Sequence, residues 1–407
     1  MVSCGMQRIL VLGGGFAGLW SAVGAARKLD ELGIGPDRVE VTLVSASPWH
    51  SIRVRNYEAA LDGTRLPLDE VLGPIGVRRI EAEVVDIDFK KRQVACAGSS
   101  EPLPYDRLVF ALGSKLARPP IPGLAEHAFD VDTYDAAVRL NQHIAGLANR
   151  KPSPGRNTVL VIGGGLTGIE AATETPVKLR AAFGEGASWK VILADHKPWI
   201  GSDMGDEARP VIAEAMAALA IDGRPGVSIT AVDAGGVTLA SGERIAAETV
   251  VWCAGMQANP LTKCFPVERD RFGRLPVAPD LKVLGMAAEF AAGDVAWFAV
   301  DGHKSCVMSC QHGRPMGRYA GHNAVADLFG LPTLPLVIPA YVTILDLGAW
   351  GAVYTEGWDR HVVSTGAAAK QTKITINQQR IYPPRSGVRA DILAAGAPVV
   401  QAPPARH

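Results

Sequence analysis

The chain repeats one short pattern, in which an apolar run is followed by closely spaced glycines and a second apolar run. RILVLGGGFAGLW begins at Arg8, and TVLVIGGGLTGIE begins at Thr158. In the first copy Gly13, Gly15 and Gly18 meet the spacing G-x-G-x-x-G. The first glycine allows a tight turn, the second lets the backbone approach a diphosphate, and the third lets helix and strand pack closely. Each copy therefore predicts a strand, a phosphate-binding turn and the start of a helix.

The spacing from the glycines to the end of the next strand also repeats. VEVTLVS ends at Ser45, 32 positions after Gly13, and KVILAD ends at Asp195, 32 positions after Gly163. The glycines of the second copy are Gly163, Gly165 and Gly168. Two complete βαβ units follow, so we expect an α/β chain with two Rossmann-like dinucleotide-binding domains.

The residue at each strand end indicates how a ribose is held. An acid at this place binds ribose hydroxyls and repels a 2′-phosphate, so Asp195 favours NADH over NADPH. NADPH stays open because His196 and Lys197 are adjacent. Ser45 leaves the first unit without an acid, so its ribose must be held by a hydroxyl or by neighbouring groups.

Charge and cysteine content narrow the classes of protein. Lys plus Arg and Asp plus Glu both number 41, which gives no support for nucleic-acid binding or a basic membrane patch. Cysteines are scattered through apolar stretches, as expected for reduced thiols in a cytoplasmic protein: Cys4, Cys96, Cys253, Cys264, Cys306 and Cys310.

RILVL follows the N-terminus too closely for a secretion signal. The longest apolar stretch, 334–354, contains Pro335, Pro339 and Asp346, so we expect no integral membrane segment.

Three further motifs carry a family resemblance. YDRLVFALGS ends at Ser114, IPG begins at Ile121, and AAGDVA contains Asp294. Together with the glycine repeats they resemble the two-dinucleotide flavoprotein reductases. The resemblance implies FAD in the first unit, NAD(P)H in the second, and Asp294 on the ribityl chain of the flavin. It also implies an FAD domain of residues 1–118 and 266–330, an inserted NAD(P)H domain of residues 119–265, and a C-terminal region of residues 331–407.

Within that family the chain is most similar to the type II NADH dehydrogenases, which are NADH:quinone oxidoreductases. SPWHSIRVRNYEAAL lacks the cysteine pair of the disulfide reductases. GGGLTGIEAA matches the segment that places an acid, here Glu170, beside the nicotinamide and flavin. PWHSIRVRNYEAA resembles another family stretch at His50 and Tyr57. CVMSCQHG retains one of two quinone-site glutamines, as Gln311, while Val307 replaces the other.

The resemblance assigns roles residue by residue. Glu170 and His312 would manage protons at the acceptor, Gln311 would contact it, and a helix beginning near Ser305 would point its N–H groups at the flavin. The FAD residues would be Gly13, Gly15, Phe16, Ala17, Gly18, Ser45, His50, Ala111, Gly113, Gly293, Asp294, Ser305 and Cys306. The NAD residues would be Gly163, Gly165, Leu166, Thr167, Gly168, Asp195, Ala254 and Gly255. Glu170, Gln311, His50 and His312 also have purely structural interpretations, and Cys306 and Cys310 suit an ordinary core.

Three functions stay open at this point. The first is an FAD-dependent NADH oxidoreductase that passes two electrons to a quinone or a similar small organic acceptor. The second is a reductase of a ferredoxin- or rubredoxin-type carrier, with a basic patch of Arg53, Arg55, Arg314 and Arg318. The third is an NADH-responsive redox sensor with little turnover. A homodimer and loose membrane association are also left open.

The C-terminal region departs from the nucleotide-binding pattern. YVTILDLG and GAVYTEGWD predict two strands joined by a turn at Gly348 to Gly351. AAAKQTKITINQQRI predicts a short helix ending before Pro383. Type II NADH dehydrogenases usually end in an amphipathic helical hairpin on the membrane, and no basic, aromatic-faced helix of that kind is present in the sequence. The terminal APVVQAPPARH is predicted to be loose.

Overall fold

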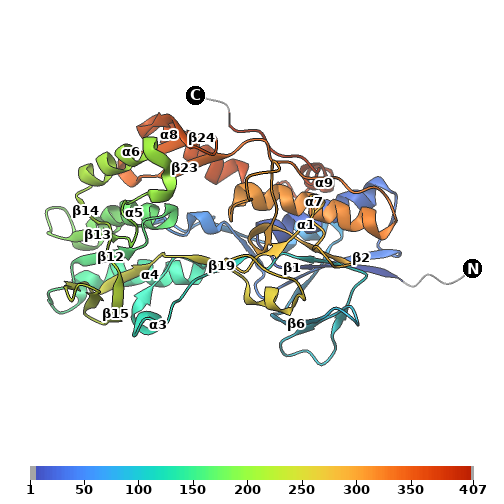
Figure 1. Ribbon diagram of the computed structural model, residues 1–407, viewed down its shortest axis with the longest axis horizontal. Coiled ribbons are helices and arrows are strands. Elements are labelled where there is room, and N and C mark those ends of the chain that lie inside the picture. Colours follow the sequence, from blue (N-terminus) through green and yellow to red (C-terminus); the bar gives the residue numbers. More distant parts are fainter. Residues whose placement is uncertain (1–5, 405–407) are drawn as a thin grey trace, which may run out of the picture.

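The first unit is a five-stranded parallel sheet in the computed structural model, which describes residues 6–404. Its strand order is β21 (Glu289–Ala291), β9 (Arg107–Phe110), β1 (Gln7–Leu12), β2 (Val39–Ser45) and β5 (Arg78–Glu81). The central strand β1 pairs with both β2 and β9 through runs of fully buried aliphatic residues. Helices α1 (Phe16–Glu31) and α7 (Cys310–Leu328) cover one face, and the antiparallel sheet containing β6 (Val84–Asp88) lies toward the other (Figure 1).

The second unit repeats this design with a sheet of its own. Its order is β11 (Ala128–Phe129), β18 (Thr249–Trp252), β12 (Thr158–Ile162), β13 (Lys190–Ala194) and β14 (Ile221–Arg224), all parallel. Helices α4 (Tyr134–Gly146), α5 (Leu166–Phe183) and α6 (Gly205–Ala218) pack on it, together with the small sheet β15 (Ile229–Asp233), β16 (Gly236–Leu239) and β17 (Arg244–Ala246). The predicted α/β fold with two Rossmann-like units is confirmed.

The chain passes between the units through an antiparallel strand pair. β10 (Ser114–Leu116) leaves the first unit and β19 (Met256–Ala258) returns to it, with Ser114 opposite Ala258. Strand β21 then completes the first sheet by pairing with β9. This connectivity supports the proposed division into residues 1–118 and 266–330 around an inserted domain of residues 119–265.

Short elements fill the connections. In the first unit these are β3 (Trp49–Ser51), β4 (Arg65–Pro67), α2 (Asp69–Leu72), β7 (Gln93–Cys96), β8 (Leu103–Pro104), β20 (Leu275–Pro276) and β22 (Ala296–Trp297), and in the second α3 (Leu124–His127). The region that would carry the cysteine pair of a disulfide reductase forms β3 and a 3-10 turn, Arg53–Arg55, rather than an α-helix.

Glycines allow α1 and α7 to lie in close contact. Gly313, Gly317 and Gly321 fall on one face of α7, because they are spaced four residues apart. A Cβ at Gly317 would overlap the carbonyl oxygen of Ala17, and one at Gly321 would overlap that of Ser21. The two helices therefore approach backbone to backbone, which places the N-terminus of α7 beside the first glycine turn.

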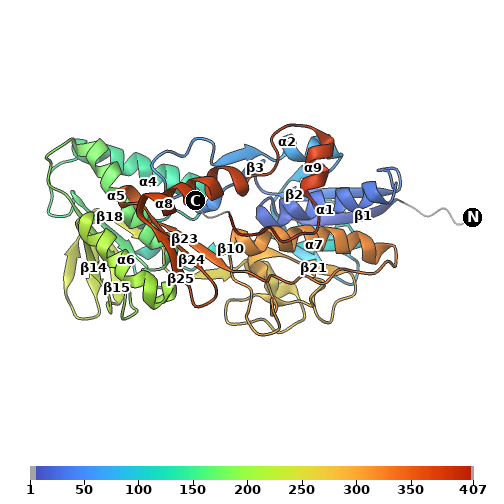
Figure 2. The same cartoon turned by 90° about the horizontal axis from the view of Figure 1, so that it is seen from above.

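The C-terminal region packs across both units. β23 (Val342–Asp346), β24 (Ala352–Glu356) and β25 (His361–Thr365) form an antiparallel sheet, which leads into α8 (Gly366–Thr375) and a π-helical turn, Ile376–Arg380. Seen from above, α8 lies over the second unit, and α9 (Arg389–Ala395) lies beside α1 (Figure 2). The predicted hairpin and helix are confirmed, whereas β25 and α9 are additional. Among residues 6–404 no helix has both the length and the apolar character needed to cross a bilayer.

The terminal segment is more ordered than the sequence suggests. Residues 397–404 form no helix or strand, but side chains of Arg314 and Arg318 donate hydrogen bonds to Gln401 and Val399. The expectation of a loose tail is therefore wrong for these residues. Residues 405–407 and Cys4 lie outside the described part of the chain, within which the five cysteines are all unpaired.

Candidate nucleotide sites and the buried carboxylates between them

The first glycine turn has the geometry expected of a phosphate-binding loop. Gly13 has a φ of 110°, and a Cβ at Gly18 would overlap the carbonyl oxygen of Gly13. By contrast, a Cβ at Gly15 would meet no atom of the described chain within 4 Å, so the backbone there faces open space. Phe16 and Ala17 follow in the first turn of α1, whose free N–H groups point into the same space.

His50 closes one side of this turn. Its Nδ1 lies 2.9 Å from the carbonyl oxygen of Gly14, so Nδ1 carries the proton and donates it. The imidazole is fully buried with its edge against the ring of Phe16, and burial lowers the pKa of His50 to about 4. Its Nε2 has no partner among the described residues. His50 is therefore neutral and keeps one acceptor directed into the buried site.

The second glycine turn repeats this geometry and adds an acid. Gly163 has a φ of 114°, and a Cβ at Gly168 would overlap the carbonyl oxygen of Gly163. The buried Asp195 accepts hydrogen bonds from the backbone of Gly164 (2.5 Å) and Lys197 (2.9 Å). A cavity of about 170 Å³ lies here, lined by residues that include Gly163, Asp195, His196, Trp252 and Ala254. It opens at the carboxyl ends of parallel strands, where α/β sheets bind ligands.

The remaining predicted cofactor residues fall at equivalent strand ends. Ala111 and Gly113 follow β9, while Ala254 and Gly255 follow β18. Gly165, Leu166 and Thr167 form the turn into α5 and its start, matching the first unit. Ser45 occupies the place of Asp195, and its hydroxyl accepts a hydrogen bond from the backbone of Ser47 (3.3 Å). Their contacts with a cofactor stay predictions.

Asp294 lies beside the first glycine turn and the strand that leads into the second unit. It follows β21 in the 3-10 turn Gly293–Val295, where a Cβ at Gly293 would press on Ala17. The hydroxyl of Ser114 donates to Asp294 (2.6 Å) and accepts from Arg53 (2.9 Å), which also forms an ion pair with Asp132. Burial raises the pKa of Asp294, while Ser114 and Arg53 oppose the rise. The Asp294 carboxylate thus lies beside the first glycine turn.

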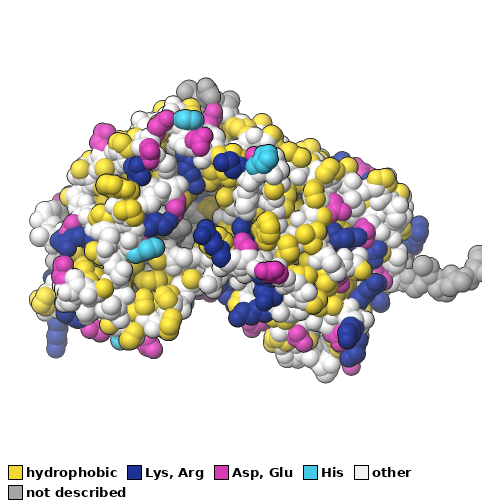
Figure 3. Space-filling model, in the orientation of Figure 1, with side chains coloured by type: hydrophobic (Ala, Val, Ile, Leu, Met, Phe, Trp, Pro, Cys, Tyr) yellow, Lys and Arg dark blue, Asp and Glu magenta, His cyan; other side chains and the backbone are white. Residues whose placement is uncertain are grey.

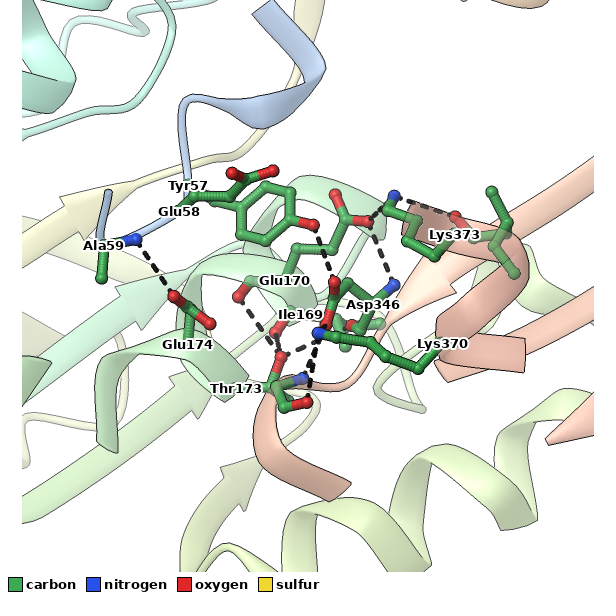
Figure 4. Close-up of polar contacts among 12 residues, drawn as sticks. Tyr57, Glu58, Ala59, Ile169, Glu170, Thr173, Glu174, Asp346, Lys370 and Lys373 are labelled. Carbon is green, nitrogen blue, oxygen red and sulfur yellow. Dashed lines mark hydrogen bonds and ion pairs between the residues drawn. The ribbon is translucent and has the colours of Figure 1, made fainter. Parts of the chain in front are cut away.

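Glu170 belongs to a buried network drawn from three parts of the chain (Figure 4). Its Oε1 accepts hydrogen bonds from the Lys373 ammonium (2.6 Å) and the backbone N–H of Asp346 (3.1 Å). Asp346 in turn accepts from the Tyr57 hydroxyl (3.0 Å) and the Lys370 ammonium (2.6 Å). Glu170 therefore links the second unit to the C-terminal region, and Asp346 links that region to the first unit through Tyr57.

Burial and charge act in opposite directions on this network. Burial raises the pKa of Glu170, whereas the ammonium of Lys373 lowers it, and the net shift is upward. Burial also raises the pKa of Tyr57, and the carboxylates of Glu170 and Asp346 add to that rise. Glu170 therefore holds a proton more readily than an ordinary glutamate, which suits it to take part in proton exchange.

The start of α7 differs from the prediction. The helix begins at Cys310, because the hydroxyl of Ser309 caps it by accepting from the backbone N–H of His312 (3.3 Å). The prediction of a helix start near Ser305 is therefore wrong. Ser305 instead forms a β-bridge with Ala299, and Cys306 donates its N–H to Phe298 (3.0 Å). Extended backbone thus precedes the capping serine.

Gln311 and His312 are both tied to nearby backbone. In the orientation that satisfies both ends of its amide, Gln311 donates to the carbonyl of Val342 (2.9 Å) and accepts from its N–H (3.3 Å). The Nδ1 of His312 accepts from Val307 N–H (3.0 Å), so the proton is on Nε2. Burial lowers the pKa of His312 to about 4, and its ring meets Tyr341 and Trp358 edge-on. His312 is therefore a neutral donor near pH 7 rather than a base.

The four arginines considered for a carrier surface do not form an exposed patch. Arg55, Arg314 and Arg318 are buried, Arg55 pairs with Glu58, and Arg53 faces Asp132. Figure 3 shows basic and acidic side chains interspersed over one face, with the surface hollowed between the two units.

Two parallel-sheet units, each with a dinucleotide-type turn, define the class of pyridine-nucleotide-dependent flavoprotein oxidoreductases. Residues 7–317 match the description of the pyridine nucleotide-disulphide oxidoreductases, and the chain belongs to this family. It is 58% identical, over 98% of its length and 100% of the relative, to an NADH dehydrogenase-like protein of Mycobacterium tuberculosis. A type II NADH:quinone oxidoreductase of the same species is 28% identical, covering 80% of this chain and 73% of the relative. The resemblance to type II NADH dehydrogenases is thus confirmed.

A solved structure supports the fold independently of sequence. That of NDH2 from Plasmodium falciparum in complex with NADH aligns with a TM-score of 0.77, covering 96% of this chain and 97% of that one, at 14% identity. At that identity the likeness concerns the fold.

Sequence reasoning identified Glu170 but missed its partners. Lys373, Asp346 and Lys370 follow the region of family resemblance used to predict the site, and they read as an ordinary strand end and a helix face. A signal was present in the spacing of Lys370 and Lys373, which places two cations on one side of a short helix. It did not reveal that this side faces Glu170.

Proposed function

We propose that the chain is an FAD-dependent NADH oxidoreductase that passes two electrons to a quinone or a similar small organic acceptor. The observation that carries this proposal is the buried ion pair of Glu170 and Lys373. Glu170 lies on the helix after the second glycine turn and is linked through Asp346 to Tyr57 of the first unit. The names of its relatives, NADH dehydrogenase-like protein and type II NADH:quinone oxidoreductase, support the same assignment.

The residues of the first unit fit FAD. Open space at Gly15, the close contact of Gly18 with Gly13, and the unpartnered Nε2 of His50 together form a cradle for a diphosphate-linked cofactor. Asp294, partly buried beside this cradle, would accept hydrogen bonds from the ribityl hydroxyls. The second unit fits NADH, because Asp195 would bind the ribose hydroxyls and repel a 2′-phosphate.

When bound, a flavin accepts a hydride from NADH and returns two electrons to an acceptor. The residues of this chain would supply the proton chemistry. Glu170 would hold a proton at its carboxylate and exchange it with an acceptor oxygen, while Lys373 stabilises the charged form. His312 would donate a hydrogen bond from Nε2, and Gln311 would fix β23 against the start of α7.

Stopped-flow reduction by NADH under anaerobic conditions, followed by mixing with acceptors, tests the proposal. We expect NADH to bleach the flavin and soluble quinones to restore its colour, with ferredoxin- and rubredoxin-type carriers inactive. Glu170→Gln should slow the reoxidation step about 10²–10⁴-fold and slow it more than reduction. Glu174→Gln is the matched control, since Glu174 lies one turn along α5 and accepts from Ala59 N–H instead. Failure of NADH to reduce the flavin, or equal effects of both substitutions on reoxidation, would contradict the proposal.

Neither alternative function gains support from the structure. A carrier reductase would need an exposed basic patch, and Arg55, Arg314 and Arg318 are buried. Slow reoxidation by every acceptor in the same experiment would indicate the redox sensor instead. A cytoplasmic location, with loose attachment to a membrane, and a homodimer remain proposals.

A further inference from the structure

Three arginines converge on one short stretch of the C-terminal segment. Arg318 Nη1 donates to the carbonyl of Val399 (3.4 Å), and Arg314 Nη1 donates to the side-chain oxygen of Gln401 (3.0 Å). From the π-helical turn after α8, Arg380 Nη2 donates to the carbonyl of Ala402 (2.5 Å). Each guanidinium thus ends on a neutral oxygen of residues 399–402.

These arginines lack acidic partners within residues 6–404. Arg314 and Arg318 are only 7% and 6% exposed, yet neither they nor Arg380 forms an ion pair with a described carboxylate. The Nε groups of Arg314 and Arg318 and the indole N–H of Trp20 are buried without partners. The Trp20 ring lies under both guanidinium groups, 4.2 Å from that of Arg318 and 5.7 Å from that of Arg314.

Such a cluster of buried donors is unfavourable as it stands. Burial lowers the pKa of Arg318 to about 10, with the charge of Arg314 as the second cause, and burial lowers the pKa of Arg314 as well. Arginine is rarely buried without a charged partner, because neutral oxygens compensate poorly for the lost hydration. A phosphate group offers several charged oxygens and matches the planar fork of a guanidinium.

The segment that covers the cluster has no regular secondary structure. Residues 397–404 form no helix or strand, and the side chain of Val399 is 54% exposed. Its contacts with the cluster are the three hydrogen bonds to Arg314, Arg318 and Arg380. The side chain of Val400 is partly buried against the core of the first unit, so an anion that displaces residues 399–402 also has to release this one apolar contact.

We propose that Arg314, Arg318 and Arg380 form a binding site for a phosphate group, which residues 399–402 occupy with neutral acceptors until an anion displaces them. The site lies along α7 and does not depend on the oxidoreductase function proposed above. A free phosphorylated metabolite and a phospholipid headgroup share the required chemistry.

Calorimetric titration of the FAD-loaded protein with inorganic phosphate tests the site, at constant ionic strength and with chloride as the reference. A chain ending at Pro398, which lacks the covering segment, should bind phosphate at least tenfold more tightly than the full chain. Arg318→Gln in this shortened chain should weaken binding at least tenfold. If Arg318→Gln does not fold, Arg380→Gln takes its place, because Arg380 is only partly buried. Arg389→Gln is the matched control, since the exposed Arg389 pairs with Asp30.

Vesicles distinguish the two sources of the phosphate group. A lipid headgroup would be supported if the protein co-sediments with vesicles that contain phosphatidylglycerol but not with vesicles of pure phosphatidylcholine. This co-sedimentation should require Arg318. Tight binding of free phosphate that requires Arg318 would support a soluble ligand. Phosphate or vesicle binding that is unchanged by Arg318→Gln and Arg380→Gln, or no binding by the shortened chain, would overturn the proposal.

Discussion

Replacing Lys373 with methionine removes one half of a buried ion pair and leaves Glu170 charged in the interior. Lys373 is about 7% exposed, and its ammonium lies 2.6 Å from Glu170 Oε1. Breaking such a pair by removing one partner costs about 3–5 kcal/mol, because the remaining charge keeps its desolvation penalty. For a domain of the size of the second unit, 1 kcal/mol shifts the unfolding midpoint by roughly 2–4 °C. We therefore expect Lys373→Met to lower this midpoint by about 6–20 °C at pH 7.5.

The loss should depend on pH in a defined direction. Burial raises the folded-state pKa of Glu170 above 4.5, its ordinary value, and Lys373 opposes that rise. A raised folded pKa means that the unfolded chain releases the proton first, so stability falls as pH rises above about 4.5. Lys373→Met raises this pKa further, because the opposing cation is removed. The difference between wild type and variant should therefore be small near pH 4.5 and grow toward pH 8.

Thermal unfolding followed by circular dichroism, on FAD-loaded protein between pH 4.5 and 8, measures this difference. The double variant Glu170→Gln, Lys373→Met should recover most of the loss, because no uncompensated charge remains. Lys370→Met is the control on the same helix, since Lys370 is 31% exposed and Asp346 keeps its bonds to Tyr57 and Gly348. If the deficit of Lys373→Met is equal at pH 4.5 and 8, or if the double variant is no more stable, the electrostatic account of this network is wrong.

Three shorter predictions concern the nucleotide sites and α7. Gly168→Ala should raise the KM for NADH more than tenfold while flavin content is unchanged, because the added Cβ would overlap the carbonyl oxygen of Gly163. Steady-state kinetics with an unchanged KM would contradict this prediction. Asp195→Ser should weaken NADH binding by about 1.5–3 kcal/mol, which raises the KM for NADH roughly tenfold to a hundredfold, and should reduce the preference for NADH over NADPH. If the ratio of kcat/KM for NADH to that for NADPH is unchanged, Asp195 does not contact the ribose. Burial lowers the pKa of His312 to about 4, so the contribution of the neutral imidazole to stability should be full above pH 6.5 and lost between pH 6.5 and 4. If the unfolding midpoints of wild type and His312→Gln stay parallel across this pH range, this prediction is wrong.

Local sequence rules predicted those parts of the site that depend on neighbouring residues. The turns at Gly13 and Gly163, and the helices that follow, arise from backbone freedom and helix packing within about thirty residues. The strand ends at Ser45 and at Ala194, one residue before Asp195, were equally local, because the distance from each glycine is set by one helix and one strand. Strand β21 was not predicted as an element, because the resemblance assigned residues 266–330 to the first domain without placing a strand in its sheet.

Long-range contacts, and the choice between two possible helix N-caps, could not be predicted from local sequence. Ser305 and Ser309 are both reasonable helix caps by composition, and only the bridge of Ser305 to Ala299 decides between them. Lys373 lies 203 residues from Glu170, so no periodicity connects the two. Gln311 was considered for contact with the acceptor, but its amide is taken up by the backbone of Val342.

The C-terminal region is therefore part of the candidate site and cannot be regarded as an appendage. Without it, Glu170 on α5 would be left without the Lys373 ammonium and the Asp346 N–H, and the Tyr57 hydroxyl without the Asp346 carboxylate. Glu170 and Asp346 lie on different segments, and each accepts a hydrogen bond from a lysine of α8. Because the Lys373 ammonium on α8 lowers the pKa of Glu170, a substitution that tilts α8 away from Glu170, without touching either carboxylate, should raise that pKa and alter the pH dependence of turnover.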